Sequence, residues 1–506
     1  MMIINWIDFG QVSAERDDNL SNYFFENGVL QSAIASRYQF LILGRKGAGK
    51  TAVFQHFRDN PNKYIPKEEI SISMSLQNYS WDVHGLLVTD GKASSLAYIQ
   101  SWKYVIYLMT IKELGAQEKL SGKLKKASRI IEKIYTSPTP TLAQVIGQKL
   151  LQLSHLKLPS GGLDLDDDAI DALSIQGGEI TFNNTRDDAS LQAKLNQSVE
   201  RITDIFEDAL LDGISSHQRI FVSFDRIDEA WDAASFESSQ RIIAGLIGAA
   251  EYINSKFSGK LRPLVFLRED IFETLDINDK NKLRSDCGQL LAWKKDGLSR
   301  MILERVNYFA RSNGQKEISK VDELFDKDQM RQQRAPFDHI MLRTMLRPRV
   351  FIKMFQLIKK DMIERRDDPF NEEEINSAKL ECQAIYNVEP AYSEWLVEEL
   401  RDEWRAQFPM INKLLEAIQN IGRTNFTGDD LRESLHRLSV LPSPGEMNTY
   451  MKFLFDNSII GFRVGKSNQW RYKCFFSSQG FVESEIYKVH DGLHRGLNLT
   501  ESRSAS

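Results

Sequence analysis

Cysteines are scarce in this sequence, and long apolar runs are absent. Its three cysteines, Cys287, Cys382 and Cys474, form neither a CxxC pair nor a Cys/His cluster. This spacing excludes a disulfide framework and a structural zinc site, and it favours a reducing compartment. No segment approaches the ~20 consecutive apolar residues of a membrane-spanning helix, and residues 1–8 lack the features of a secretory signal. We therefore expect a soluble, cytoplasmic protein with no membrane partner.

A strong excess of charge is also missing. The formal net charge is −5, and 42% of the residues are hydrophobic. This balance argues against a surface that coats nucleic acid throughout, although it is compatible with a local basic patch. A chain of 506 residues is too long to fold around a single hydrophobic core, so about two to four domains are expected. No motif of a nuclease, protease or deaminase occurs.

What the sequence does contain is an apolar stretch at 38–43 that runs into a glycine-rich loop ending in Lys-Thr. Glycines let successive backbone N–H groups turn toward phosphate oxygens, and the following helix presents its positive end to them. Lys50 supplies a charge for the β and γ phosphates, and the Thr51 hydroxyl is a ligand for Mg²⁺. The predicted nucleotide-binding residues are Gly44, Arg45, Lys46, Gly47, Ala48, Gly49, Lys50 and Thr51.

Further apolar runs supply the other strands of a P-loop sheet. Helical periodicity covers 239–256 and 297–309. Strands that alternate with helices form a parallel sheet covered on both faces, so the predicted fold class is α/β. The predicted ATPase core occupies residues 1–310, with a helical insertion at about 115–200. The predicted additional strands lie at 69–74, 219–225, 263–268 and 289–293.

The insertion has a sequence character of its own. Residues 119–133 form a basic helical stretch, residues 141–153 an amphipathic helix, and residues 156–165 a hairpin-like turn. Aspartates cluster after this turn, and such charges usually form a solvated surface rather than a metal or partner site. The cluster comprises Asp166, Asp167, Asp168 and Asp171.

Beyond residue 310 the pattern becomes helical. Stretches at 321–331, 337–346 and 349–365 predict an α-helical lid over residues 311–388. Pro348 lies at the start of the third helix, where a proline fixes the entry of the chain. The flanking Arg347 and Arg349 are therefore candidates to reach the nucleotide from the lid. The alternative is a pair of solvated charges on a basic helix.

A winged-helix-like domain is predicted at 389–499, followed by a tail at 500–506. Two strands at 459–464 and 469–473, joined by a polar turn at 466–468, form the predicted ribbon. Helices followed by a two-stranded ribbon are typical of this domain. The predicted helices lie at 393–407, 410–420, 427–438 and 444–456.

A carboxylate ends one of the predicted core strands. Asp225 closes the run at 219–225, where it can hold Mg²⁺ or its waters beside the loop. Hydrolysis also needs a group that orients or deprotonates the attacking water. Asp228 and Glu229 both follow within one turn, while Arg226 stands where many related sequences carry an acid. The choice between Asp228 and Glu229 as the catalytic acid stays open.

Arg268 ends the next predicted strand. Because the carboxyl ends of parallel strands converge on the nucleotide cleft, a positive charge there can sense the γ phosphate. The alternative is an ordinary ion pair with Glu269 or Asp270.

Taken together, these motifs resemble those of a bacterial family of largely uncharacterised P-loop ATPases allied to the STAND, KAP and ORC-type groups. The resemblance covers nearly the whole chain. The matching segments are Phe9-Gly10, Ala14-Glu15, 44–51, 224–229, 267–271, 347–349 and 489–493.

The resemblance implies an ASCE-type ATPase core, a helical lid and a C-terminal winged helix. It also implies sensor-like positions for Arg268 and Arg349, and a segment around Phe9 that approaches the base of the nucleotide. Relatives of this kind often act as nucleotide-switched assemblies, including in antiviral defence.

The leading hypothesis is a Mg²⁺-dependent ATPase whose bound ATP closes the lid and the winged-helix domain, so that hydrolysis drives a conformational or assembly switch. One alternative is a DNA-binding protein whose affinity ATP tunes, and another is a nucleotide-binding scaffold without turnover. The expected partners are ATP, further copies of the chain in a homo-oligomer, and a protein effector or DNA at the C-terminal domain. The sequence does not separate ATP from GTP.

Overall fold

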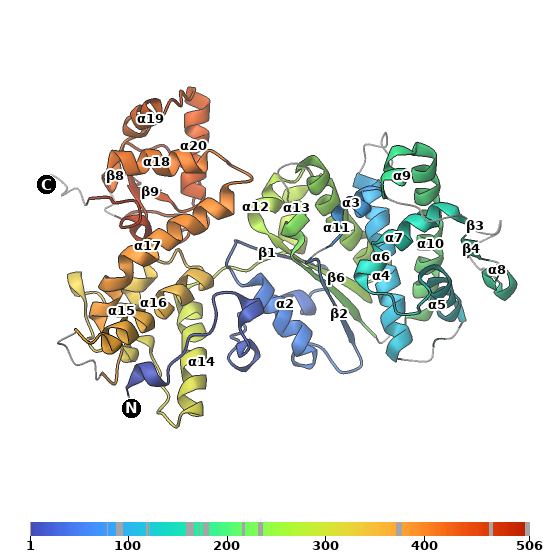
Figure 1. Cartoon of the computed structure of the whole chain (residues 1–506), viewed down its shortest axis with the longest axis horizontal. Coiled ribbons are helices and arrows are strands. Elements are labelled where there is room, and N and C mark those ends of the chain that lie inside the picture. Colours follow the sequence, from blue (N-terminus) through green and yellow to red (C-terminus); the bar gives the residue numbers. More distant parts are fainter. Residues whose placement is uncertain are drawn as a thin grey trace. The chain divides into compact units, whose positions relative to one another are not determined.

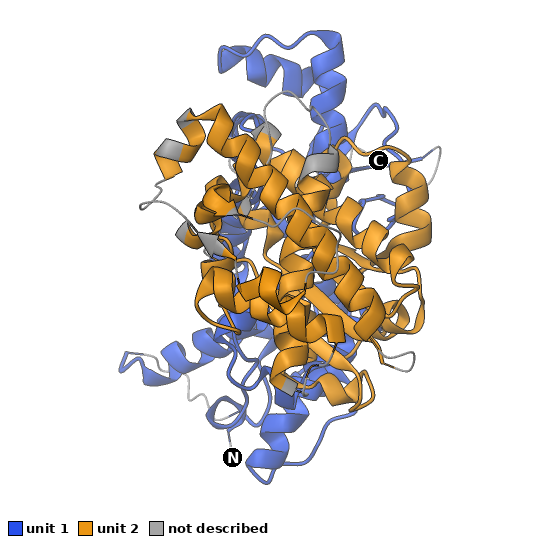
Figure 2. Ribbon diagram, turned by 90° about the vertical axis from the view of Figure 1, so that its right-hand side faces the viewer, with its two compact units in different colours: residues 1–25, 46–49, 292–506 blue, residues 26–45, 50–291 orange. Residues whose placement is uncertain are grey.

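The chain forms two compact units (Figure 2). Unit 1 comprises residues 1–25, 46–49 and 292–506, and unit 2 comprises residues 26–45 and 50–291. The computed structural model describes residues 2–77, 79–87, 95–117, 120, 122–157, 166–171, 173–175, 182–214, 218–230, 236–370, 377–464 and 469–500.

A five-stranded parallel sheet forms the centre of unit 2 (Figure 1). Every neighbouring pair of strands is parallel, and the order across the sheet is β2-β5-β6-β1-β7. The predicted parallel α/β sheet is therefore confirmed, with the last strand shorter than expected. The strands are β1 (Leu41–Gly44), β2 (Ile70–Ser75), β5 (Ile220–Asp225), β6 (Leu261–Arg268) and β7 (Gly288–Leu290).

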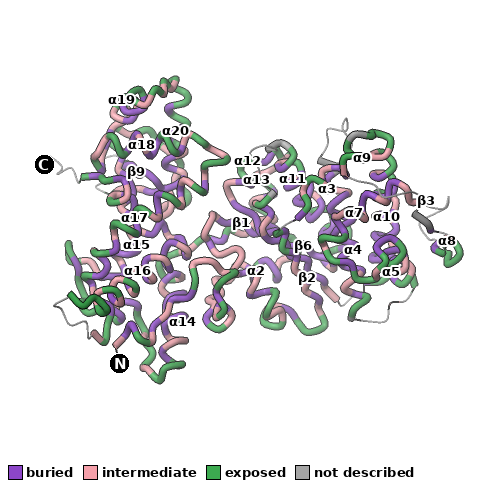
Figure 3. The backbone as a smooth tube through the Cα atoms, in the orientation of Figure 1, coloured by how far each residue is buried: buried purple, intermediate pink, exposed green. Residues whose placement is uncertain are grey.

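Burial on both faces explains why these strands are continuous apolar runs. Every residue of β1, β5 and β6 is buried (Figure 3), as expected for a parallel sheet covered by helices. The register pairs Gly44 with Arg268 and Phe224 with Val265. The carboxyl ends of β1, β5 and β6 thus meet at one edge of the sheet.

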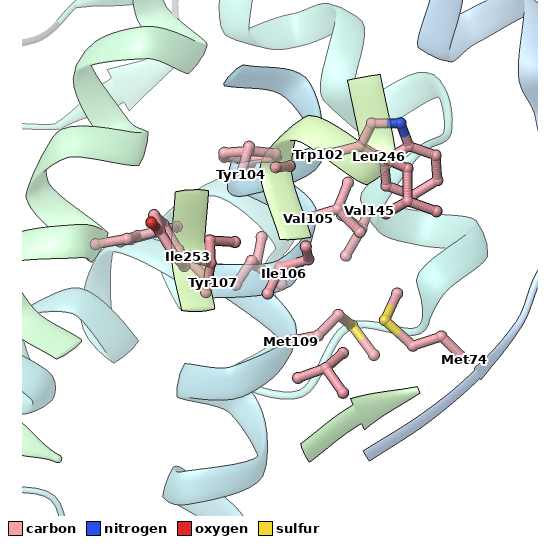
Figure 4. Packing of buried hydrophobic residues seen from close by; sticks show 14 of the residues in the cluster. Met74, Trp102, Tyr104, Val105, Ile106, Tyr107, Met109, Val145, Leu246 and Ile253 are labelled. Atoms are coloured by element: carbon pink, nitrogen blue, oxygen red, sulfur yellow. The ribbon is translucent and has the colours of Figure 1, made fainter. Parts of the chain in front are cut away.

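The largest core cluster of unit 2 lies around helix α4 (Ser95–Gln117), which packs against α10 (Ala189–Gly213) and α11 (Phe236–Lys256). Figure 4 shows Trp102 and Tyr107 of α4 among aliphatic side chains of this core. The indole N–H of Trp102 donates to the backbone oxygen of Ile242, 2.9 Å away. Because α4 is buried on most sides, it is apolar on more than one face.

One predicted helix of the insertion is broken in the structure. Residues 141–153 form two short helices, α6 (Leu142–Val145) and α7 (Gln148–Leu151), followed by the 3₁₀ turn η5 (Gln152–His155). Gly147 interrupts them with an extended backbone, at φ −125° and ψ −162°. The prediction of a single helix was therefore wrong.

The acidic cluster lies on a short helix, α8 (Asp167–Asp171), opposite α5 (Gly122–Tyr135). Arg129 of α5 pairs with Asp167 at 2.5 Å and with Asp171 at 2.7 Å, and both carboxylates are exposed. This is the solvated surface that the sequence favoured. Strands β3 (Leu156–Lys157) and β4 (Ser174–Ile175) pair antiparallel as a hairpin requires, while the predicted turn residues 158–165 lie outside the described residues.

In unit 1, helices α14 (Lys295–Ser312), α16 (Pro348–Asp367), α17 (Cys382–Trp404) and α18 (Ile411–Ile421) contribute to a second core, together with the short α15 (Pro336–Met341). In the part of the chain that the structure describes, no helix is both long and apolar enough to cross a membrane.

Two sequence predictions in this region differ from the structure. The helix predicted at 321–331 is a single 3₁₀ turn, η8 (Val321–Leu324), after which Phe325 makes a β-bridge to Leu380. Helix α17 begins eleven residues before the predicted 393, and it runs through Pro390 and the predicted domain boundary at 388/389. Buried residues at 385, 388, 392 and 396 keep the helical spacing across that proline.

The C-terminal part of unit 1 combines three helices with a three-stranded antiparallel sheet, β8-β10-β9, in which β8 is Asn425–Phe426. Helices α18, α19 (Gly428–Arg437) and α20 (Pro444–Asp456) confirm three predicted helices. The predicted ribbon was wrong in its pairing, because β9 (Ile460–Phe462) pairs with β10 (Tyr487–Val489) rather than with 469–473. Of that stretch, Arg471 alone bridges β9, and the predicted turn 466–468 lies outside the described residues.

Candidate functional site

The glycine-rich loop connects β1 to helix α2 (Lys50–Asp59), so the predicted strand-loop-helix is confirmed. Gly47 and Gly49 have φ values of +77° and +96°. Only glycine adopts this backbone region without strain, and it lets consecutive N–H groups turn to one side. A Cβ at Gly47 would also lie 3.1 Å from the Cβ of Arg349.

Lys50 is the first residue of α2, and its side chain turns back along the loop. Its Nζ donates to the carbonyl oxygens of Gly44, at 3.0 Å, and Arg45, at 3.3 Å. Burial lowers the pKa of Lys50, which the charges of Asp228 and Asp225 partly offset. The ammonium group therefore sits in a partly desolvated position beside two acids, where its charge acts strongly on an anionic ligand.

The two predicted Mg²⁺ ligands meet in the structure. The Thr51 hydroxyl and the backbone N–H of Arg226 both lie close enough to the carboxylate of Asp225 to lower its pKa. Burial is the largest influence on Asp225 and raises its pKa to about 6.

This pair of oxygen donors suits Mg²⁺, which is usually held by one or two protein oxygens together with phosphate oxygens and waters. Within the described residues, no group of three or more His, Cys, Asp or Glu side chains could hold a metal. The donor set thus fits an ion that arrives with a phosphate ligand.

The two candidate catalytic acids have different surroundings. Glu229 pairs with Arg226 at 2.9 Å, and Arg226 has a left-handed backbone with φ +63°. Asp228 is the acid that most strongly affects Lys50, and it also raises the pKa of Asp225. The charge of Asp228 therefore acts on both Lys50 and Asp225, whereas the carboxylate of Glu229 is paired with Arg226.

Arg268 lies at the end of β6 and precedes α12 (Glu269–Thr274). Its guanidinium holds Asp270 through two hydrogen bonds, of 3.2 and 2.6 Å, as one of the two sequence interpretations expected. Arg268 and Asp270 also act on the pKa of Lys50 in opposite directions. Arg45 of the loop lies 4.0 Å from Glu269.

The tip of the loop, Lys46 to Gly49, groups with unit 1. The backbone N–H of Arg349 donates to the Gly47 carbonyl at 3.3 Å. The indole N–H of Trp293 donates to the Ala48 carbonyl at 2.7 Å. Trp293 was missed as a site residue because the sequence placed it inside a strand, although a polar aromatic just after an apolar run is a usable signal.

The lid arginines both pair with carboxylates on α17. The guanidinium of Arg349 lies 3.4 Å from Glu399. Arg347 is buried and forms a 2.6 Å ion pair with Glu403. Arg347 therefore helps to join α16 to α17, while its predicted contact with nucleotide stays a prediction.

Phe9 lies in the core of unit 1. Its ring packs against Phe355 with a centroid separation of 5.0 Å, and its carbonyl accepts a 2.6 Å hydrogen bond from Arg305. Its side chain is 1% exposed. The structure thus gives Phe9 a packing role, and its approach to a nucleotide base stays a prediction.

Asp225 should make stability depend on pH. Its folded pKa of about 6 exceeds the ordinary 3.8, so between these values the folded state keeps a proton that the unfolded state has lost. The contribution of Asp225 to the free energy of unfolding is therefore full below pH 4 and lost as pH rises through 6. For a shift of about two units the loss is about 3 kcal/mol.

We expect Asp225→Asn to abolish this dependence, so that the variant gains stability over wild type as pH rises from 4 to 7. Urea unfolding of both proteins in a chelating buffer measures the difference. A difference that does not change with pH would contradict the assignment.

Part of the chain is similar to a known family. Residues 296–401 match the family described as the FunZ-associated C-terminal helical domain. They extend from α14 into α17 and contain Arg347 and Arg349. The whole of the predicted lid, residues 311–388, lies within this region.

The whole chain is also similar to a curated protein and to two solved structures. It is 22% identical to the "Putative transposon gamma-delta 80.3 kDa protein" of Escherichia coli (strain K12), over 98% of this chain and 68% of that protein. The crystal structure of Cdc6p from Pyrobaculum aerophilum covers 93% of this chain and 91% of its own, at 10% identity and a TM-score of 0.31. The Aeropyrum pernix ORC1 protein, solved in complex with DNA, covers 96% of each chain at 11% identity and a TM-score of 0.36.

Proposed function

We propose that this chain binds ATP with Mg²⁺ and hydrolyses it, and that its nucleotide state controls domain closure or assembly. The observation that carries the proposal is the proximity of Thr51, Asp225 and Lys50, since Thr51 and Lys50 both act on the pKa of Asp225 and Asp225 acts on that of Lys50. These residues come from α2 and β5, at the edge of a parallel sheet where a glycine-rich loop also begins. Open α/β sheets bind their ligands at this edge.

In this proposal each group has a separate task. The loop N–H groups surround the phosphates, and Lys50 adds a positive charge at the β and γ phosphates. Thr51 and Asp225 hold Mg²⁺, which neutralises charge that develops on the phosphate oxygens. The strand order supports an ASCE-type core, since β6 separates β1 from β5.

Hydrolysis is assigned to Asp228. Its carboxylate orients a water molecule and accepts its proton while the water oxygen attacks the γ phosphorus and the bond to ADP breaks. Glu229 is the weaker candidate because Arg226 pairs with it. Arg268 and Arg349 are proposed to add positive charge at the γ phosphate, which requires each to loosen its present carboxylate, Asp270 or Glu399.

The proposed switch rests on helix α16. Its first turn is bonded to the loop through Arg349 and Gly47, and its preceding residue, Arg347, is paired with α17. A change in the loop's conformation would therefore alter the contacts of α16 and, through Arg347, of α17. The sequence resemblance alone supports a role in bacterial antiviral defence, a homo-oligomer and a protein effector.

DNA binding through the C-terminal domain has less support. Arg432 and Arg437 of α19 pair with Asp429 and Glu433, and Lys452 is the one basic residue in α20. A helix that binds DNA phosphates normally offers several cations. DNA binding and a scaffold without turnover stay the alternative predictions.

The test is binding and turnover by the wild-type chain. We expect a slowly hydrolysed ATP analogue to bind in the range of about 1 μM to 1 mM, more tightly with Mg²⁺ than without, and ATP to release phosphate. Calorimetry measures binding of the analogue, with GTP as competitor, and a phosphate assay measures hydrolysis. Solution mass with ADP and with the analogue, each with and without DNA, tests the switch. No binding at ~1 mM would reject the proposal.

A further inference from the structure

We propose that Trp293 is a positioning residue for the phosphate loop. Its indole N–H and the backbone N–H of Arg349 hold two loop carbonyls on one side, which directs the N–H groups of Ala48 and Gly49 toward the phosphates. This inference rests on the proposed function and extends it to a residue that no sequence motif identifies.

The geometry of the peptide unit carries the argument. Arg349 N donates to Gly47 O at 3.3 Å, and Trp293 Nε1 donates to Ala48 O at 2.7 Å. In a planar trans peptide, the C=O of one residue points opposite to the N–H of the next. Holding the Gly47 carbonyl thus orients the N–H of Ala48, and holding the Ala48 carbonyl orients the N–H of Gly49. Consecutive N–H groups on one side form an anion-binding nest.

The indole is held in place by neighbours in unit 1. Its ring lies 6.2 Å from that of Phe25, centroid to centroid. Gly297 of α14 lies close to the benzene part of the ring, since a Cβ there would be 3.3 Å from Trp293 Cε3. The donor is therefore fixed by packing before any ligand binds.

The loop needs such a hold because its glycines make it flexible. Gly47 and Gly49 both have positive φ, and glycine visits many other conformations at little cost. A flipped peptide would turn a carbonyl oxygen toward the phosphates in place of an N–H. Donors that are oriented in advance bind anions more tightly, because less ordering is required on binding.

The experiment compares two tryptophan variants. Trp293→Phe keeps an aromatic ring and removes the donor. Trp404→Phe is the matched control, because the indole N–H of Trp404 is buried in the same unit without a hydrogen-bond partner. We expect Trp293→Phe to bind Mg·ADP and Mg·pyrophosphate about 3- to 10-fold more weakly by calorimetry, with equal losses for both ligands, and Trp404→Phe to bind as wild type does.

Each outcome bears on the inference. Equal binding by Trp293→Phe and wild type overturns it, as does an equal loss in Trp404→Phe. A loss for ADP without one for pyrophosphate also overturns it, because the effect would then concern the nucleoside. If Trp293→Phe does not fold, Gly297→Ala, whose Cβ would lie 3.3 Å from Trp293 Cε3 and press on the indole, should weaken pyrophosphate binding, and unchanged binding overturns the inference. Failure of the wild type to bind either ligand instead rejects the proposed function.

Discussion

Asp228→Asn is expected to release phosphate from ATP about 10²–10⁴-fold more slowly than the wild type, while Mg·ATP binding is largely kept. Asparagine has nearly the same shape as aspartate but does not accept the proton of the attacking water. The charge of Asp228 acts on both Lys50 and Asp225, the residues proposed to bind the phosphates and Mg²⁺. Single-turnover phosphate release, with binding measured in parallel, separates the two effects.

The matched control is Glu229→Gln. Glu229 is adjacent in sequence, but its carboxylate pairs with Arg226 at 2.9 Å. We expect this variant to lose far less activity than Asp228→Asn. If Glu229→Gln is the more severe change, the assignment of the two acids has to be reversed.

Lys50→Ala should weaken Mg·ATP binding by about 30- to 5,000-fold, which corresponds to about 2–5 kcal/mol for truncating a desolvated charge contact. The ammonium of Lys50 is partly buried, and its present partners are two neutral carbonyl oxygens, at 3.0 and 3.3 Å. Its charge can thus act on phosphate oxygens, although Asp225 and Asp228 also act on it. Turnover at a fixed ATP concentration should fall at least in proportion.

Lys67→Ala provides the control for charge alone, since Lys67 is an exposed lysine of the same unit. It should bind and hydrolyse ATP as the wild type does. Equal phosphate release by Lys50→Ala and wild type would show that hydrolysis, if seen, arises elsewhere.

Most strands of the sheet and the loop could be predicted from the sequence, because they depend on residues that are close together in the chain. Residues 44–51 are adjacent in the chain, and their glycines meet the positive φ values found at Gly47 and Gly49. The strands are buried on both faces, so each stands out as an apolar run.

Errors arose where local pattern and packing disagree. Residues 141–153 have helical periodicity, but the extended backbone of Gly147 divides them. Pro390 suggested a boundary, yet buried contacts keep α17 continuous through it. The partner of β9 was placed next in sequence, whereas pairing selects β10, after a longer connection.

The amino-acid order alone was enough to predict a glycine-rich loop between a strand and a helix, its lysine and threonine, and a carboxylate at a strand end, because covalent spacing and burial pattern define them. Only the folded chain showed that Arg226, which has a left-handed backbone, pairs with Glu229, and this ion pair underlies the proposed choice of Asp228. It also joined Trp293 to Ala48 across 245 positions of sequence. Such a hydrogen bond depends on how the tertiary structure positions the indole, and a local sequence pattern does not contain that information.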